Sequence, residues 1–320
     1  MKAYLDILRD VYTNCKTLRM NRTGIPDIGI GHGATFTHDM ANGFPLLTTK
    51  KMGLKNIATE LEFFIKGITD KKWLQDRKCK IWNEWANPVA VKEEYDIRLA
   101  QSPNAINDSA AREKLRNDIA DQTRDLGPIY GWQWRHFGGE YQWDTARIDA
   151  NPTDNYNRTK PGKDQVSDAI YSLTHNPNDR RIIVSAWNPT DMYQMALPPC
   201  HMMHQLIVRD GKLNLIWTQR SCDMFLGIPY NIASYALLLL LYAKEAGLKP
   251  GVLRGELHDV HIYQNHLDQV HEQLSRAPHK LPTVEIPDDN WCGMLNWSAD
   301  GGFVLKDYIC HEKLTGAVAR

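Results

Sequence analysis

The sequence lacks three features that would place it in a simple functional class. Its 38 basic and 38 acidic residues cancel, so its charge does not predict binding to nucleic acid or to an anionic membrane. The longest apolar run, 236–243, is too short to span a bilayer. The N-terminus has interspersed charges and no signal-peptide core. We therefore expect a cytoplasmic protein with no nucleic-acid or membrane partner, in which local arginines hold any anionic ligand.

The chain also lacks the cysteine patterns of disulfide frameworks and zinc sites. None of its six cysteines belongs to a C-x-x-C pair, which favours reduced thiols. His201 and His204 are three residues apart, a spacing that places two side chains on opposite faces of a strand. The cysteine and histidine spacings fit no zinc pattern, so we predict no metal.

Hydrophobic periodicity predicts an α+β fold with a mostly antiparallel sheet and helices beside it. Residues 231–247 are apolar nearly all round and end at Gly247, which indicates a buried helix with a glycine stop. Asp210-Gly211 separates two apolar runs and is typical of a hairpin turn. Further helices are predicted at 3–15 and 54–66, and strands at 180–187, 204–210 and 213–219.

Two polar stretches interrupt this pattern. Residues 88–125 are charge-rich with helical patches, and we interpret them as a surface insertion. Residues 144–164 are rich in Asn, Asp, Pro, Thr and Gly and are predicted to form a loop. The chain has no internal repeat or low-complexity tract, and its length allows one large domain or two ordinary ones.

Cys200 lies in P-P-C-H, and three interpretations of it compete: a buried thiol, a metal ligand and a nucleophile. A nucleophilic thiolate needs positive charge nearby. His201 is a poor partner, because neighbouring residues on a strand point to opposite faces. Arginines elsewhere can supply the charge and clamp a phosphate. They are Arg22, Arg180, Arg181 and Arg220.

A carboxylate also lies in the apolar helix A-T-E-L-E-F-F. Burial of Glu60 is costly unless the carboxylate is paired or functional. Glu62 is two residues further on and projects to another side of the helix, so we do not expect the two to act as a pair.

Taken together, seven motifs resemble the thymidylate synthase superfamily. They are N-R-T-G at 21–24, I-W-N-E-W at 81–85, G-P-I-Y-G-W-Q-W-R at 127–135, D-R-R-I-I-V-S-A-W-N at 179–188, P-P-C-H at 198–201, Q-R-S-C-D-M-F-L-G-I-P-Y-N-I-A-S-Y-A-L-L at 219–238 and H-I-Y-Q-N-H at 261–266. The resemblance extends from the first helix to the C-terminal A-V-A-R. It implies one catalytic domain over 1–320, with a large twisted mixed sheet flanked by helices, and a homodimer formed through that sheet.

The resemblance also implies a reaction between dUMP and 5,10-methylenetetrahydrofolate. Cys200 would add to C6 of uracil and make C5 nucleophilic toward the methylene carbon. The implied catalytic residues are Cys200, Glu60, Tyr130, His201, Asp223 and Asn231. The implied nucleotide-binding residues are Arg22, Gln219, Arg220, Ser221, Asn231, His261 and Tyr263, with Arg180 and Arg181 donated by the partner subunit. The implied folate-binding residues are Ile81, Trp82, Trp85, Leu197, Asp223, Leu226, Gly227, Tyr230 and Ala317.

Asn231 matches the position that selects the base. Its amide can donate to uracil O4 and accept from N3–H, whereas family members that take cytosine nucleotides carry Asp there. The sequence therefore favours dUMP. Asn231 can also be interpreted as a helix N-cap, and the two roles are compatible.

Several departures from the synthase pattern resemble phage nucleotide hydroxymethylases. They include E-L-E-F-F at 60–64, Trp132 after Y-G, and G-H-G-A-T-F at 31–36. His204 adds a polar group where synthases have an apolar or small one, and a wetter site favours water over hydride. We therefore predict a dUMP hydroxymethylase that forms 5-hydroxymethyl-dUMP. Thymidylate synthase is the alternative, and a non-catalytic nucleic-acid-binding or regulatory protein is a remoter one.

Overall fold

The computed structural model describes residues 1–101, 108–289 and 291–318. The chain divides into two compact units. Unit 1 comprises Met1–Leu61, Asp168–Val184 and Cys200–Arg320, and unit 2 comprises Glu62–Ser167 and Ser185–Pro199. The single-domain prediction stays a prediction. Within the described ranges, no helix combines the length and the apolar character that a membrane span needs.

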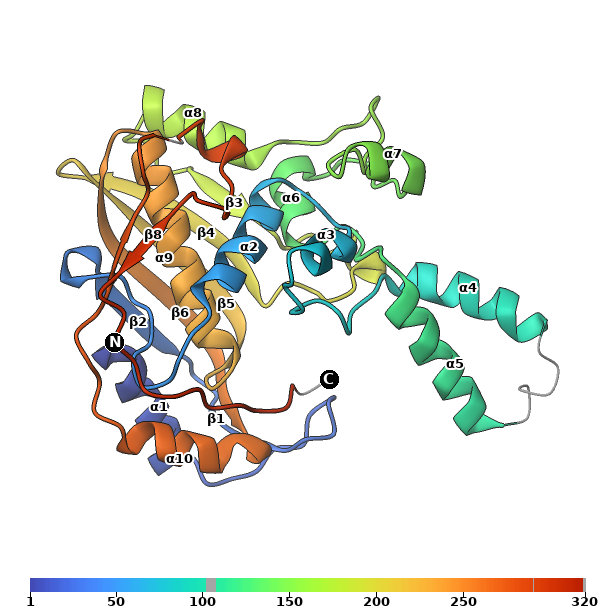
Figure 1. Ribbon diagram of the computed structural model, residues 1–320, viewed down its shortest axis with the longest axis horizontal. Coiled ribbons are helices and arrows are strands. Elements are labelled where there is room, and N and C mark those ends of the chain that lie inside the picture. The colour runs from blue at the N-terminus through green and yellow to red at the C-terminus, as the bar shows by residue number, and fades with distance from the viewer. Residues whose placement is uncertain (102–107, 290, 319–320) are drawn as a thin grey trace. The chain divides into compact units, whose positions relative to one another are not determined.

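A mixed sheet forms the centre of unit 1 (Figure 1), and it confirms the α+β prediction. Among the described residues it has six strands in the order β1-β6-β5-β4-β3, with β2 also paired to β6. β5 and β6 run parallel, whereas β4 is antiparallel to β5, and β1 and β2 are antiparallel to β6. The strands are β1 (Asp27–Ile30), β2 (Ala34–Asp39), β3 (Ile183–Ser185), β4 (His201–Arg209), β5 (Lys212–Asp223) and β6 (Lys249–Tyr263). A separate pair consists of β7 (Thr283–Glu285) and β8 (Val304–Lys306).

The predicted hairpin joins β4 to β5. Asp210 and Gly211 both adopt left-handed backbone angles, with φ of 51° and 71°. A two-residue turn with positive φ at both positions matches the twist of antiparallel strands, which is why Asp-Gly predicted it.

The predicted buried helix is α9 (Gly227–Glu245), which lies along the sheet and contacts β5 and β6 (Figure 1). Its Tyr235 ring stacks on Trp217 of β5, with ring centroids 5.2 Å apart. Gly255 of β6 accommodates Trp217, because a Cβ there would lie 2.4 Å from the indole. The helix ends at Glu245 and is capped by Ala246, and the predicted glycine stop, Gly247, follows with a φ of 65°. Unit 1 also contains α1 (Lys2–Asn14) and α10 (Leu267–Ser275), which pack together.

Unit 2 is mainly helical. The polar segment 88–125 contains α4 (Pro88–Ala100) and α5 (Ser109–Gln122), which lie side by side (Figure 1), and 102–107 between them lie outside the described residues. The predicted loop at 144–164 contains one short helix, α7 (Thr145–Ala150), which Asp144 caps. The other helices here are α3 (Lys71–Asp76) and α6 (Tyr130–His136). α2 (Leu54–Ile65) and α8 (Gln165–His175) cross the unit boundaries.

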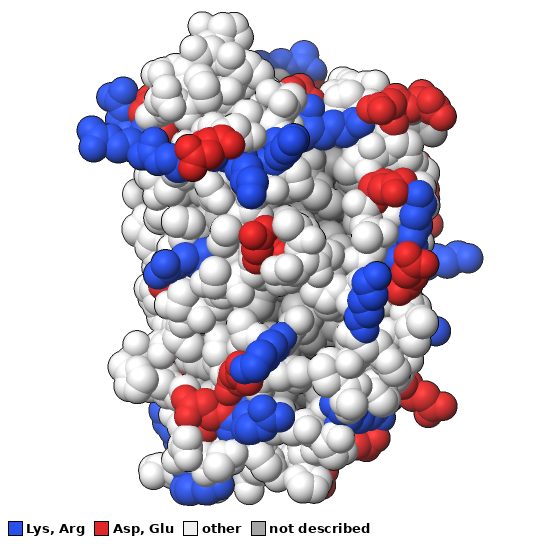
Figure 2. All heavy atoms as spheres, turned by 90° about the vertical axis from the view of Figure 1, so that its left-hand side faces the viewer, with Lys and Arg blue, Asp and Glu red and all other residues white. Residues whose placement is uncertain are grey.

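Charges of both signs are interspersed on the face drawn in Figure 2, and much of its middle carries neither sign. This mixed surface agrees with the equal numbers of acidic and basic residues in the chain.

Candidate active site

Cys200 lies next to Arg220 at the open end of the β4–β5 hairpin. The Arg220 backbone N–H donates to Cys200 O at 2.8 Å, and the following pair in the register is His201 with Gln219. Residues that face each other across antiparallel strands project to the same side of the sheet. The half-buried thiol therefore shares its side with a guanidinium, which favours the thiolate.

The structure contradicts the prediction that His201 and His204 lie on opposite faces of a strand. A β-bulge between His201 and Met203 inserts one extra residue into β4, so His201 and His204 lie on the same side of the strand. His201 Nδ1 is 2.9 Å from the Tyr235 hydroxyl, and the His204 ring lies 5.8 Å from the Tyr235 ring. As predicted, His201 does not share its side with Cys200.

Both histidines are buried, and burial lowers the pKa of each to about 3. Their rings are therefore neutral at pH 7 and cannot supply positive charge to a thiolate. His204 also packs against Tyr242, at 5.9 Å between ring centroids, and none of its surface is exposed. The expectation that His204 makes the site wetter is wrong, because the bulge turns it into the apolar core beneath α9.

Gln219 orients the base-selecting residue. Its Nε2 donates to Asn231 Oδ1 at 3.0 Å and to Ser221 O at 2.9 Å, while its Oε1 accepts from Trp217 Nε1 at 3.2 Å. Asn231 Oδ1 has a second lone pair, and its NH₂ remains a donor. The N-cap interpretation of Asn231 is wrong, because α9 begins four residues earlier and Leu226 is its N-cap.

Asp223 stabilises the turn that precedes α9. Its Oδ1 accepts from the backbone N–H groups of Phe225 at 2.9 Å and Leu226 at 3.2 Å. Asp223 Oδ2 makes no hydrogen bond to any described residue, so one carboxylate oxygen stays available to a ligand. Gly227 and Tyr230 follow in the first turns of α9, and both are half-buried.

Lys50 is a residue that the sequence reasoning missed. It is buried, its ammonium bonds to Phe225 O, and it lies 3.8 Å from the centre of the Phe225 ring. Burial lowers its pKa to about 8, and the nearby Asp223 charge opposes this shift. In the sequence it stands in T-T-K-K, which resembles an exposed polar turn and carries no signal of burial.

The C-terminal segment is bound to the same unit. Ala317 O lies 2.8 Å from His266 Nε2. Gly316 fits closely there, because a Cβ would lie 2.7 Å from the His266 ring and 2.9 Å from the Phe225 ring. Exposed Ala317, a predicted folate contact, is thus held by a buried histidine.

His261 and Tyr263 lie at the end of β6, and His261 pairs in register with Asp223. Their rings are 5.0 Å apart at 82°. Burial lowers the pKa of His261, but the Asp259 hydrogen bond and nearby carboxylates outweigh this and raise it overall. Burial raises the Tyr263 pKa, the carboxylates of Asp223 and Asp27 raise it further, and Arg22 lowers it. Arg22 therefore lies close enough to Tyr263 to affect its charge, so predicted nucleotide-binding residues that are far apart in sequence lie near each other.

The other predicted residues of unit 1 lie elsewhere in that unit. Arg180 and Arg181 are exposed, line a surface hollow beside Asn176 and stand just before the edge strand β3. Arg181 Nε is ion-paired with Asp179 at 3.0 Å. Glu60 on α2 is only half-buried, so the strong burial expected of it is not observed. Donation of the two arginines to a partner subunit stays a prediction.

In unit 2 the predicted residues Trp82 and Tyr130 form one aromatic cluster with Phe64. Phe64 stacks on Tyr130 at 4.9 Å and meets Trp82 edge-on at 6.3 Å. Buried Lys71 donates to the carbonyls of Trp85, Asn83 and Ala120 at 2.8–3.1 Å and so anchors the Trp82–Trp85 loop. Trp85 and Leu197 are half-buried, and Ile81 is exposed.

Two further departures from the synthase pattern have structural partners in unit 2. Trp132 is fully buried and meets Tyr141 edge-on at 5.5 Å. Glu62 is 3% exposed and ion-paired with Lys66 at 2.5 Å, so it is the buried carboxylate of the helix. Within the described residues, no three His, Cys, Asp or Glu side chains are grouped as metal ligands.

Comparison with known proteins agrees with the resemblance in the motifs. The thymidylate synthase family model matches residues 2–320. A thymidylate synthase of Mycoplasma pneumoniae is 41% identical over 323 residues, covering all of both chains. One from Mycoplasma genitalium is 40% identical over 319 residues of both full chains, and one from Listeria monocytogenes is 40% identical over 305 residues, 90% of each chain. The chain therefore belongs to the thymidylate synthase family.

Proposed function

We propose that this protein is a thymidylate synthase that converts dUMP to dTMP. The co-substrate 5,10-methylenetetrahydrofolate supplies the methylene carbon and then a hydride, and it leaves as dihydrofolate. The observation that carries the proposal is the placement of Cys200 beside Arg220, in a chain that matches enzymes named thymidylate synthase over its full length.

The nucleotide is activated by residues of unit 1. Cys200 Sγ forms a bond to uracil C6, and the electron pair of the C5=C6 bond shifts toward O4. The Asn231 NH₂ group donates to O4 as negative charge develops there, and Asn231 Oδ1 accepts from N3–H. Arg220 and Arg22 bind the phosphate, and Arg220 also stabilises the thiolate before attack. Ser221, His261 and Tyr263 complete the contacts to phosphate and sugar.

Proton transfer completes the reaction. The C5 proton must leave before the product forms, and the Sγ–C6 bond must break to regenerate C5=C6. Glu60, which is half-buried, serves these transfers through water together with His201. Tyr130 of unit 2 is proposed as a further catalytic residue. Because His201 is neutral at pH 7, it accepts or donates hydrogen bonds in this network and does not act as a cation.

The residues of unit 1 also fit a reduced folate. Asp223 Oδ2 can accept from the amide and amine donors of the pterin, and Leu226, Gly227 and Tyr230 offer half-buried surface beside it. Ala317 contributes from the C-terminal segment. Ile81, Trp82, Trp85 and Leu197 of unit 2 are also proposed as folate-binding residues.

Hydride capture is favoured over the water capture predicted from the sequence, because the hydroxymethylase-like departures serve packing. Gly33 has a φ of 78° and lies so close to β6 that a Cβ would meet Leu257 O at 2.5 Å. Phe36, at the end of the same motif, packs on Trp217 at 5.9 Å. Trp132 and His204 are fully buried, so neither makes the site wetter. The relatives' names support the same choice.

A homodimer in which Arg180 and Arg181 reach the phosphate of the partner subunit is part of the proposal. Both side chains are exposed and line the same surface hollow. Alternate β5 side chains, Asn214, Ile216 and Thr218, are half-exposed on the side of the sheet away from α9 and are available to such an interface.

The test is to incubate the purified protein with dUMP and methylenetetrahydrofolate and to identify both products by mass spectrometry. We expect dTMP and dihydrofolate in equal amounts. Formation of 5-hydroxymethyl-dUMP with tetrahydrofolate would instead support the hydroxymethylase prediction and contradict the proposal. Parallel incubation with dCMP should give no product, because Asn231 cannot complement cytosine as Asp would.

A further inference from the structure

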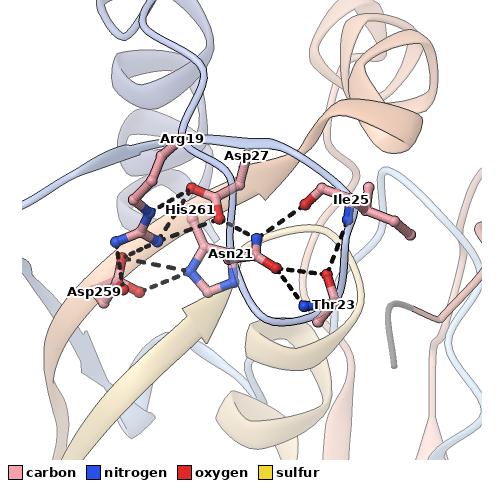
Figure 3. A network of polar contacts seen from close by, with 7 residues as sticks. All are labelled: Arg19, Asn21, Thr23, Ile25, Asp27, Asp259 and His261. Atoms are coloured by element: carbon pink, nitrogen blue, oxygen red, sulfur yellow. Dashed lines mark hydrogen bonds and ion pairs between the residues drawn. The ribbon is translucent and has the colours of Figure 1, made fainter.

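The loop between Asn21 and Ile25 contains Arg22, and the Asn21 side chain stabilises it through hydrogen bonds to other residues of the loop. Asn21 Oδ1 accepts from the Thr23 N–H at 2.9 Å and the Thr23 hydroxyl at 2.6 Å. Asn21 Nδ2 donates to Ile25 O at 2.9 Å (Figure 3). Arg22 itself is exposed and makes no side-chain hydrogen bond or ion pair within the described residues. Its position therefore depends on how this loop is anchored.

The anchor is Asp27, a carboxylate in the first position of β1 that is only 2% exposed. Its Oδ2 accepts from Asn21 Nδ2 at 2.5 Å, and its Oδ1 accepts from Arg19 Nε at 3.2 Å. The backbones of Arg19 and Asp27 also exchange two hydrogen bonds of 2.8 and 3.0 Å. A buried carboxylate is costly unless it is paired, and Asp27 is paired on both sides.

Arg19 extends the network to β6. Its Nη1 is 3.0 Å from Asp259 Oδ2, and its Nη2 is 3.1 Å from Asp259 Oδ1 (Figure 3). Asp259 in turn holds His261, whose Nδ1 is 3.0 Å from Asp259 O and 3.7 Å from Oδ1. The pKa of Asp259 is lowered to about 2, first by the hydrogen bond to His261 and then by Arg19. The ion pair between Arg19 and Asp259 is thus charged at neutral pH.

We infer that Asp27 and Arg19 are positioning residues that fix the Arg22 loop relative to His261. The groups that bind the phosphate and the sugar of the nucleotide are thereby held at a fixed distance from each other. The inference rests on the proposed function, in which Arg22 binds phosphate and His261 binds the sugar. Neither Asp27 nor Arg19 touches the reacting atoms. Their effect is expected in nucleotide affinity, with little change in the chemical step.

The test is a double-mutant cycle on the dUMP dissociation constant, measured by titration calorimetry. Asp27→Asn keeps the shape of the side chain but removes the charge that holds Asn21 and Arg19. We expect it to weaken dUMP binding about tenfold and to raise KM for dUMP equally, while kcat changes less than about twofold. In an Arg22→Ala background, Asp27→Asn should weaken binding less than about threefold, because the residue it positions is gone. A general structural effect would give the same factor in both backgrounds and would overturn the inference.

A second variant covers the case in which Asp27→Asn does not fold. Arg19→Lys keeps a positive charge but loses the planar fork that bridges Asp27 and Asp259, and it should also weaken dUMP binding about fivefold or more. Wild-type affinity in Arg19→Lys would overturn the inference. Asp39→Asn is the matched control, since Asp39 lies on β2 and caps the Ala41 N–H, a role that Asn also fills, so its dUMP affinity should match wild type. A wild-type protein that neither binds dUMP nor turns it over would defeat the proposed function itself, whereas normal turnover with an unaffected Asp27→Asn defeats only this inference.

Discussion

Two sets of histidines in the same sheet have opposite electrostatic environments. His201 and His204 on β4 lie beneath α9, where burial lowers the pKa of each to about 3. His261 on β6 is also buried, but Asp259 and Asp223 lie close and its pKa is raised. The comparison shows that burial alone does not set the charge of a histidine. The presence of a nearby carboxylate decides whether the pKa of a buried histidine is lowered or raised. The two neutral histidines therefore belong to the core beneath α9, and His261 belongs to the region of charged side chains that includes Arg220.

The largest effect is expected in the charged region, at the nucleophile. Cys200→Ser should reduce kcat by at least about 1000-fold, because a hydroxyl is a far weaker nucleophile toward C6 than a thiolate. The measurement is steady-state turnover of dUMP. Cys15→Ser, at a half-buried cysteine on the C-terminal side of α1, is the matched control and should keep wild-type turnover. Substantial activity in Cys200→Ser would show that the nucleophile has been misassigned.

The base-selecting amide should come next. Asn231→Asp places a carboxylate where O4 gains negative charge, so kcat/KM for dUMP should fall about 100-fold. The same change should allow turnover of dCMP, whose amino group can donate to Asp. The ratio of the two kcat/KM values is the readout. An unchanged ratio would mean that Gln219 or another group selects the base.

His261 should have an intermediate effect. His261→Asn removes an imidazole held by Asp259 and should raise KM for dUMP about tenfold, the value of one hydrogen bond to the sugar. Its kcat should change little, because the sugar does not react. A fall in kcat with an unchanged KM would contradict the binding role.

The neutral histidine should matter least for activity and most for the pH dependence of stability. His204→Leu should keep kcat within about threefold of wild type and should still form dTMP, because the side chain is fully buried and packs against the Tyr235 and Tyr242 rings. A switch of product in this variant would restore His204 as the determinant of water or hydride capture.

The sign of the pH effect follows from the lowered pKa. Below about pH 6.5 the unfolded chain takes up protons at His201 and His204 that the folded chain does not, so stability falls as pH falls. Each histidine should contribute a loss of about 2 kcal/mol between pH 7 and pH 5. Urea unfolding of His204→Leu at both pH values should show a loss smaller by that amount. His261 acts in the opposite direction, since its raised pKa adds stability below about pH 6.5 that is lost as pH rises through its folded value.

The sequence by itself determined the features that depend on neighbouring residues along the chain. Asp210-Gly211 specified the hairpin because both positions need positive φ, and Gly247 specified the end of α9 for the same reason. The apolar run at 231–247 predicted a buried central helix, because a helix that is apolar on all sides is stable only when protein surrounds it. The motifs around Cys200 and Asn231 were sufficient for the family, since they are read directly from residue order.

Only the tertiary structure decided the features that depend on pairing between distant segments. The bulge after His201 arises from how β4 pairs with β5, and nothing in P-P-C-H-M-M-H marks it. One extra residue reverses which side chains face the core, and it moved His204 from an expected polar site into apolar packing. Asp27 and Asp259 are 232 positions apart in sequence, so their link through Arg19 exists only once β1 pairs with β6. Alternation predicts which residues share a face of a strand, but register across strands is set by packing that the local sequence does not contain.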